Sequence, residues 1–181
     1  MGDFLIKLIR PDLAFSSLRD FIELGGDVLL AIMLATFIMW ALIIERYWHF
    51  ATSQKGLSKD AINNWNERSD HSSWYARRIR EKLISEVKQS SERGLLYIKT
   101  LVAAAPLFGL LGTVTGMVEV FDVMAITGSS NARAMAAGIS KATLPTMSGM
   151  VASLSGLFFI AQLESRSKRE VSYVEDNLSL S

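Results

Sequence analysis

The stretch APLFGLLGTVTGM at residues 105–117 and its partner KATLPTMSG at residues 141–149 decide how this chain folds. The first lies in a long apolar run bounded by Lys99 and Glu119, and the second opens a run that carries no further charge before Glu164. Each run is long enough for a helix to cross a hydrocarbon core, which takes about 20 residues. Both contain small residues, hydroxyls and one proline where a plain lipid anchor would carry leucine. We therefore expect helices that pack closely against other helices and keep a polar line inside the membrane.

The composition of the chain excludes several classes of function. With 181 residues and a net charge of +1, the chain carries no nucleic-acid signature. It has no cysteine, which excludes a disulfide framework, a Cys-type zinc site and a thiol nucleophile, and its two histidines cannot build a His-rich metal site. The sequence shows no nucleophile–base–acid arrangement, phosphate loop or metal-ligand spacing. We expect neither an enzyme nor a bound cofactor or metal.

Residues 1–24 alternate apolar clusters with charges, and residues 25–46 follow as the first transmembrane helix. The N-terminal stretch is either an amphipathic helix lying in the membrane interface on the periplasmic side or a helix packed on its own neighbours, and both interpretations stay open. The pair Gly25-Gly26 predicts a break before the span. The span ends before Tyr47, where an aromatic belt begins.

Residues 47–94 are soluble in character and rich in Lys and Arg. Apolar residues at helical spacing predict a helical loop, with one helix starting near Ser58 and a weak break at Gly94. The arginines within residues 77–80 can bind an acidic partner or lipid headgroups, but a solvated helix face is the favoured interpretation.

Residues 95–126 and 132–163 form the second and third predicted spans, joined by a turn at residues 127–131. The charged tail, residues 164–181, continues the helical spacing beyond the membrane. Lys and Arg crowd the 47–94 loop and the tail, so the positive-inside bias places both in the cytoplasm and the N-terminus outside. The expected fold is an all-α membrane protein with three transmembrane helices and long cytoplasmic extensions.

Small residues recur at spacings of three and four on one face of each of the last two spans. They are Gly109, Gly112 and Gly116 in the second span and Gly149, Ser153 and Gly156 in the third. Glycine lowers helix stability, so a row of it needs a packing reason. We expect helices to approach one another closely along both rows.

Hydroxyl side chains stand at membrane depth in the same two spans. They include Thr113, Thr115, Thr143, Thr146 and Ser148. A lone threonine usually bonds to a carbonyl one turn back in its own helix. Several hydroxyls on facing spans also predict a hydrated or ion-facing line, and the two interpretations stay open.

Pro106 and Pro145 lack an amide donor and therefore free the carbonyls of Val102 and Lys141. A freed carbonyl can accept a hydrogen bond from water, from a hydroxyl or from an ammonium group. The simpler alternative is that each proline only kinks its helix.

Lys141 is the one charge near the start of the uncharged third run. An ionisable group at membrane depth suggests a function or a specific partner, whereas a lysine at the outer edge of the span simply reaches the interface. Both interpretations stay open. No acid lies deep in either span, because Glu119 and Asp122 sit near the outer end of the second. If ions cross here, we expect a partner to supply the carboxylate.

Residues 105–117 resemble the signature A-P-x-x-G-L-L-G-T-V-x-G-M of the MotA/TolQ/ExbB proton-channel family. Residues 138–146, followed by Gly149 and Ala152, resemble the third-span block of that family, G-I-x-x-A-L-x-x-T-x-x-G-L-x-x-A. The order of three spans with a large cytoplasmic loop is also similar. The motifs are most similar to those of the ExbB branch.

The resemblance implies an inner-membrane subunit of a motor driven by the proton-motive force, with its N-terminus periplasmic and its C-terminus cytoplasmic. It implies a homopentamer around a dimer of single-span ExbD-like helices, and a TonB-like protein that passes the work to outer-membrane transporters. Thr113 and Thr146 are then pore-lining residues that face a partner aspartate, and Thr143 joins them in the predicted ion pathway.

Many members of the family carry a glutamate at the position of Lys141. We expect this lysine to be structural or, like Pro106 and Pro145, to contact a partner, bonded to a carbonyl or to an acid of the partner. Two alternatives remain: a TolQ-like subunit that serves envelope constriction, and a structural scaffold without ion flux. The sequence does not distinguish proton from sodium coupling.

Overall fold

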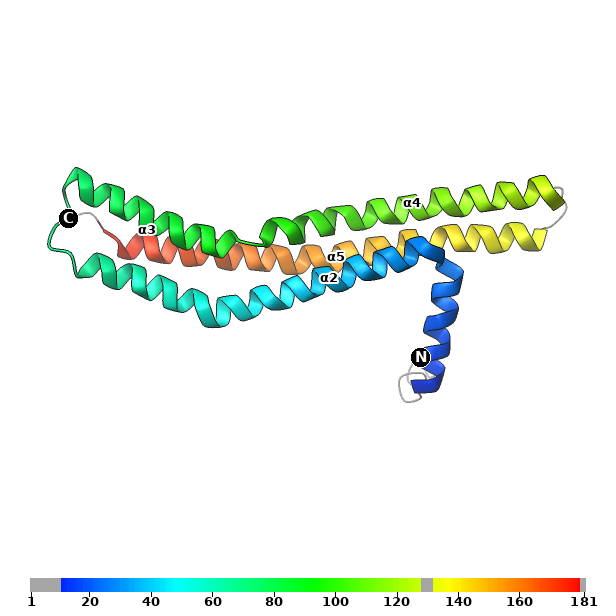
Figure 1. Ribbon diagram of the computed structural model, residues 1–181, viewed down its shortest axis with the longest axis horizontal. Helices are drawn as coiled ribbons and strands as arrows, with labels where there is room; N and C mark the ends of the chain where they lie inside the picture. Colours follow the sequence, from blue (N-terminus) through cyan, green and yellow to red (C-terminus); the bar gives the residue numbers. More distant parts are fainter. Residues whose placement is uncertain (1–10, 128–131, 180–181) are drawn as a thin grey trace. The chain divides into compact units, whose positions relative to one another are not determined.

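The computed structural model describes residues 11–127 and 132–179, and all its regular elements within these ranges are helices. They are α2 (Pro11–Asn66), α3 (Trp74–Glu92), α4 (Leu95–Thr127) and α5 (Ala132–Asn177), as Figure 1 shows. Among the described residues, three helical stretches are long and apolar enough to cross a membrane: Gly25–Asn66, Trp74–Ile126 and Met135–Asn177. The predicted all-α fold is therefore confirmed for the described residues, and so is the presence there of three helices that are long and apolar enough to span a membrane. Residues 128–131 of the predicted turn lie outside the described residues.

Helix α2 changes direction at Gly26, whose φ of 65° and ψ of −166° are open almost only to glycine. The break predicted by the glycine pair is present there. The helix start expected at Ser58 is wrong, because α2 continues unbroken to Asn66. Ser58 is buried and its hydroxyl donates to a carboxylate oxygen of Glu170 at 2.7 Å, so it does not cap a helix.

The chain divides into two compact units. The first comprises residues 1–37 and 102–154, and therefore combines the beginning of α2 with most of α4 and the first half of α5. Its buried residues are mostly small or medium-sized, among them Val102, Ala105, Ala142 and Ala152.

The second unit comprises residues 38–101 and 155–181. Its hydrophobic cluster combines residues of α2, α3 and the end of α5: Ala61, Trp65, Ala76, Val87, Val174 and Leu178. Ser73 caps the start of α3, because its hydroxyl oxygen accepts from the Ala76 amide at 3.1 Å. Gly94, with a φ of 81°, separates α3 from α4 at the predicted break.

Arg80 corrects part of the expectation for the arginine cluster. Its guanidinium is half-buried and donates to the carbonyls of Leu178 and Glu175, at 2.5 and 3.0 Å, and so satisfies groups at the C-terminal end of α5. Arg78 lies on an exposed face, pairs with Glu81 at 3.1 Å and stacks over the Trp74 ring. The solvated-face interpretation fits Arg78 but is wrong for Arg80.

Large apolar side chains point outward along the spanning stretches. They include Leu30, Leu34, Phe37, Leu110, Val114, Phe121, Val151, Leu154 and Phe158. Apolar surface of this extent is rare on a soluble monomer and indicates contact with lipid or with other membrane helices.

Candidate functional site in the seam between α4 and α5

The glycines of α4 lie directly against the backbone of α5. A Cβ atom added to Gly109 would lie 3.0 Å from the Cα of Thr146, and one added to Gly116 would lie 2.7 Å from the Cα of Ala142. A Cβ on Gly112 would collide with the ring of Pro145. These positions leave little or no room for a side chain, and at Gly109 and Gly116 the atoms nearby include backbone atoms of α5, so the two helices approach each other closely.

The small residues of α5 in turn pack closely against the backbone of α4. A Cβ on Gly149 would lie 2.5 Å from the carbonyl oxygen of Ala105. The Ser153 hydroxyl donates to the carbonyl of Val102 at 2.9 Å, which is the carbonyl that Pro106 leaves without its intrahelical amide. Gly156, the last member of the predicted row, is buried in the second unit.

Thr146 forms a second hydroxyl bridge across the seam. Its Oγ1 donates to the carbonyl of Gly109 at 3.0 Å, and the side chain is half-buried. The bridges at Ser153 and Thr146 therefore fix the antiparallel register of the two helices at two points, with the Gly149 contact between them.

The remaining hydroxyls donate within their own helices. Thr113 donates to the Leu110 carbonyl at 2.6 Å and Thr143 donates to the Ile139 carbonyl at 2.7 Å. Thr115 and Ser148 form corresponding bonds to Gly112 and Leu144. Thr143 is exposed and Thr113 is half-buried. Each of these hydroxyl groups thus donates its proton to a carbonyl oxygen. The hydroxyl oxygen keeps lone pairs that can accept a hydrogen bond.

Lys141 forms an ion pair inside the chain. Its Nζ lies 2.6 Å from Oε2 of Glu119 on α4, with the lysine side chain 34% and the glutamate side chain 53% exposed. The contacts expected for the lysine were a carbonyl or an acid of the partner, and the pairing with Glu119 was not predicted. The missing signal was the antiparallel register, which brings the two charged residues opposite each other once the glycine rows face each other.

The prolines occupy different environments. Pro145 is buried against the gap left by Gly112, whereas Pro106 is only half-buried. Pro106 leaves the Val102 carbonyl free to accept the hydrogen bond from Ser153.

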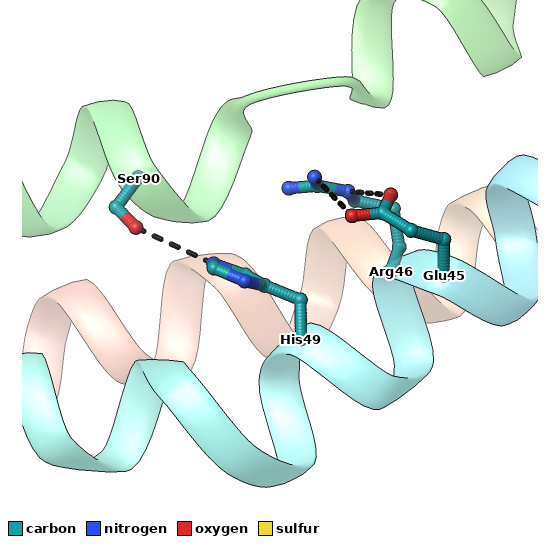
Figure 2. Close-up of polar contacts among 4 residues, drawn as sticks. All are labelled: Glu45, Arg46, His49 and Ser90. Atoms are coloured by element: carbon teal, nitrogen blue, oxygen red, sulfur yellow. Dashed lines mark hydrogen bonds and ion pairs between the residues drawn. The ribbon is translucent and has the colours of Figure 1, made fainter.

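The second unit holds a polar cluster that was not predicted from the sequence. Arg46 folds back on Glu45 through two hydrogen bonds of 2.8 Å, and His49 lies 3.5 Å from the Ser90 hydroxyl. Figure 2 shows these four side chains. Arg46 is only 8% exposed, and its Nη1 has no hydrogen-bond partner among the described residues. These side chains line an open hollow of about 1030 Å³ that also includes Gly94.

Within residues 11–127 and 132–179, no group of three or more histidine or carboxylate side chains is arranged to hold a metal ion. The seam therefore offers hydroxyl and carbonyl groups, but no metal centre in the part of the chain that the structure describes.

The profile of the MotA/TolQ/ExbB proton channel family matches residues 51–176 of the chain. The chain belongs to this family. The resemblance drawn from the two motifs is thereby confirmed. It is a family of proton channels and not a family of enzymes.

Proteins named for biopolymer transport are among the relatives of this family member. The "Putative biopolymer transport protein ExbB-like 1" of Synechocystis sp. is 37% identical over 84 residues, 45% of this chain and 33% of that protein. The "Biopolymer transport protein ExbB" of Salmonella typhimurium is 27% identical over 164 residues, 70% of this chain and 67% of that protein. An ExbB-like protein of Helicobacter pylori is 28% identical over 93 residues, covering 51% of the chain and 49% of that protein. The chain thus spans about a third of the Synechocystis relative's length.

Proposed function

We propose that the chain is the ExbB-like subunit of an inner-membrane complex that uses proton flow to energise TonB-dependent transport across the outer membrane. Family membership and the names of the relatives support this proposal. The three helical stretches that are able to span a membrane fit it as well.

The observation that carries the proposal is the state of the hydroxyls in and beside the seam. Thr113, Thr143 and Thr146 all donate their protons to backbone carbonyls, so their oxygens are left as acceptors. Acceptors of this kind suit a protonated carboxyl group or a water molecule that moves along the helices. Hydrogen bonding of this kind requires neither a metal ion nor a nucleophile.

The carboxyl group itself has to come from another protein. The sequence has no acidic residue between Lys99 and Glu119 on α4, or between Lys141 and Glu164 on α5. We therefore propose a single-span, ExbD-like partner whose aspartate meets the threonines, and a TonB-like protein that takes up the work.

The proposed assembly is a homopentamer around a dimer of partner helices. The outward-facing apolar side chains of α4 and α5 offer surfaces for neighbouring copies, for the partner helices and for lipid. The positive charges of residues 47–94 and 164–181 support a cytoplasmic loop and tail, with a periplasmic N-terminus. A mass measurement of the complex purified with its single-span partner tests this stoichiometry.

The functional test replaces the threonines by residues of similar shape. Thr113→Val and Thr146→Val remove the hydroxyls, whereas Thr113→Ser and Thr146→Ser keep them. We expect the valine variants to assemble normally with the partner but to lose proton flux and iron–siderophore uptake, and the serine variants to retain both. Normal uptake in both valine variants would favour a structural scaffold. Normal uptake in a strain that lacks the chain altogether, combined with a defect in envelope constriction, would favour a TolQ-like role.

A further inference from the structure

The ion pair between Glu119 and Lys141 lies where three segments of the first unit meet. Glu119 belongs to α4, Lys141 belongs to α5, and the kink of α2 at Gly26 lies against the lysine side chain. A Cβ atom on Gly26 would lie 3.1 Å from Cε of Lys141 and 3.8 Å from its Nζ. The kink therefore leaves room for the lysine through the absence of a side chain.

The ion pair also lies directly beside tight steps of the seam. Ala142, the residue after Lys141, faces Gly116, where a Cβ atom would lie 2.8 Å from the Ala142 Cβ. Gly138, one turn before Lys141, has no room for a Cβ because Val120 fills the space next to Glu119. The ion pair is thus compatible with the same antiparallel register of α4 and α5 as the hydroxyl bridges at Thr146 and Ser153.

A charged pair at this position has a structural effect that a single charge lacks. An isolated ammonium or carboxylate at the edge of a hydrocarbon core is costly, and each group offsets that cost for the other only while the helices keep their register. Sliding α5 along α4 by one turn, about 5.4 Å, would separate the charges. The pair therefore opposes such sliding.

We propose that Glu119 and Lys141 form a positioning pair that clasps α4 to α5 and holds the α2 kink at Gly26, and that neither group carries ions. The lysine at this position then serves the chain's own packing and does not contact the partner's acid. This inference concerns the first unit by itself and stands whether or not the chain energises TonB-dependent transport.

The test is a charge-reversal cycle read by amide hydrogen exchange on the full-length protein in lipid nanodiscs. Glu119→Lys and Lys141→Glu each place like charges together, and we expect exchange in residues 24–32 and 136–146 to become about tenfold faster. The double variant Glu119→Lys/Lys141→Glu restores the attraction, and we expect exchange to return to within about twofold of the unchanged protein.

Two variants serve as matched controls. Asp122→Lys makes the same charge change on α4 at an exposed position that has no ion pair among the described residues, and Ser140→Glu adds an acid beside Lys141 on an exposed face. We expect neither to change exchange in the two segments by more than about twofold, because surface charges interact weakly. Equal effects in controls and single reversals would overturn the proposal, as would a double variant no better than either single one.

A second pair of variants keeps the test decisive if a single reversal prevents folding. Lys141→Arg retains the charge and should keep exchange slow in both segments, whereas Lys141→Met removes it and should speed exchange. Equal exchange rates in these two variants would also overturn the proposed positioning role of the ion pair.

The double variant further separates positioning from ion conduction. If the pair only positions helices, proton flux recovers together with the slow exchange. Recovery of slow exchange without recovery of flux would show that residue 141 acts in the ion path and would overturn that half of the inference. Failure of the proposed function itself would appear separately, in the threonine variants.

Discussion

The seam of the first unit and the hydrophobic cluster of the second hold helices together by opposite means. In the seam, α4 and α5 meet through glycines at Gly109, Gly116 and Gly149, where a Cβ atom would strike the backbone of the other helix. In the cluster, a fully buried tryptophan, Trp65, packs with Val174 and Leu178. One contact depends on the absence of side chains and the other on their bulk.

The difference follows from the solvent that each region is suited to. Between helices in lipid there is no hydrophobic driving force, because the surrounding tails are as apolar as the side chains, so close backbone packing and interhelical hydrogen bonds remain. In water, burying one large apolar side chain contributes about 1.5–3 kcal/mol. The cluster lies among the charged residues of 47–94 and 164–181, where we expect water to supply that driving force.

The largest expected effect on the free energy of unfolding comes from truncating the tryptophan of the hydrophobic cluster. Trp65→Ala should lower the free energy of unfolding by about 3–5 kcal/mol, since Trp65 is only 2% exposed and its removal leaves a cavity. The matched control is Trp74→Ala, because Trp74 is 71% exposed. Urea unfolding in detergent, followed by circular dichroism, measures both. Equal losses in the two variants would mean that the cluster does not stabilise the chain through burial.

Filling the seam should have the next largest effect. Gly116→Val places a branched side chain against the backbone of Ala142 and should cost about 1–3 kcal/mol of stability through overpacking. Gly56→Val is the control, because a Cβ at Gly56 meets no atom of the described residues within 4 Å. The same unfolding measurement applies, together with recovery of the complex with the partner. A Gly116 variant as stable as the Gly56 variant would contradict close packing at the seam.

Features that repeat along a single helix were predicted from the sequence, whereas contacts between helices were not. Glycine spacing is periodic along one helix, so the rows at 109–116 and 149–156 are visible without a structure. Contacts between helices depend on register, and therefore the Lys141–Glu119 pair, the Ser58–Glu170 bond and the burial of Arg46 were missed. The freed carbonyl of Val102 was predicted, but its donor was not.

A smaller effect tests the hydroxyl bridges within the seam. Ser153→Ala removes the bond to the Val102 carbonyl that Pro106 leaves without its amide donor, and should cost about 0.5–1 kcal/mol. Ser148→Ala is the control, because the Ser148 hydroxyl bonds to the Leu144 carbonyl in its own helix and forms no bridge to another helix among the described residues. Pairwise unfolding curves in one detergent measure the difference. A larger loss in Ser148→Ala would show that the interhelical bond adds no stability.

The smallest expected effect lies at the start of α3, in the second unit. The Asp70 carboxylate accepts hydrogen bonds from the Ser73 hydroxyl and from the amides of Ser73 and Ser72, the latter two at 3.1 and 3.2 Å. The Ser73 hydroxyl, followed by these amides, lowers the pKa of Asp70 below its ordinary value of 3.8. A carboxyl group whose pKa is lower in the folded than in the unfolded state stabilises the fold above the unfolded pKa, and this contribution is lost as pH falls through the folded pKa.

Asp70→Asn removes the titrating group but keeps its shape. Unfolding midpoints compared between pH 6 and pH 3 should therefore fall slightly less steeply in the variant than in the unchanged protein. The difference between the two curves isolates Asp70 from all other carboxylates. The group is fully exposed, so the change should be smaller than that in any seam or cluster variant. Parallel curves would mean that the turn before α3 gains no stability from the negative charge of Asp70.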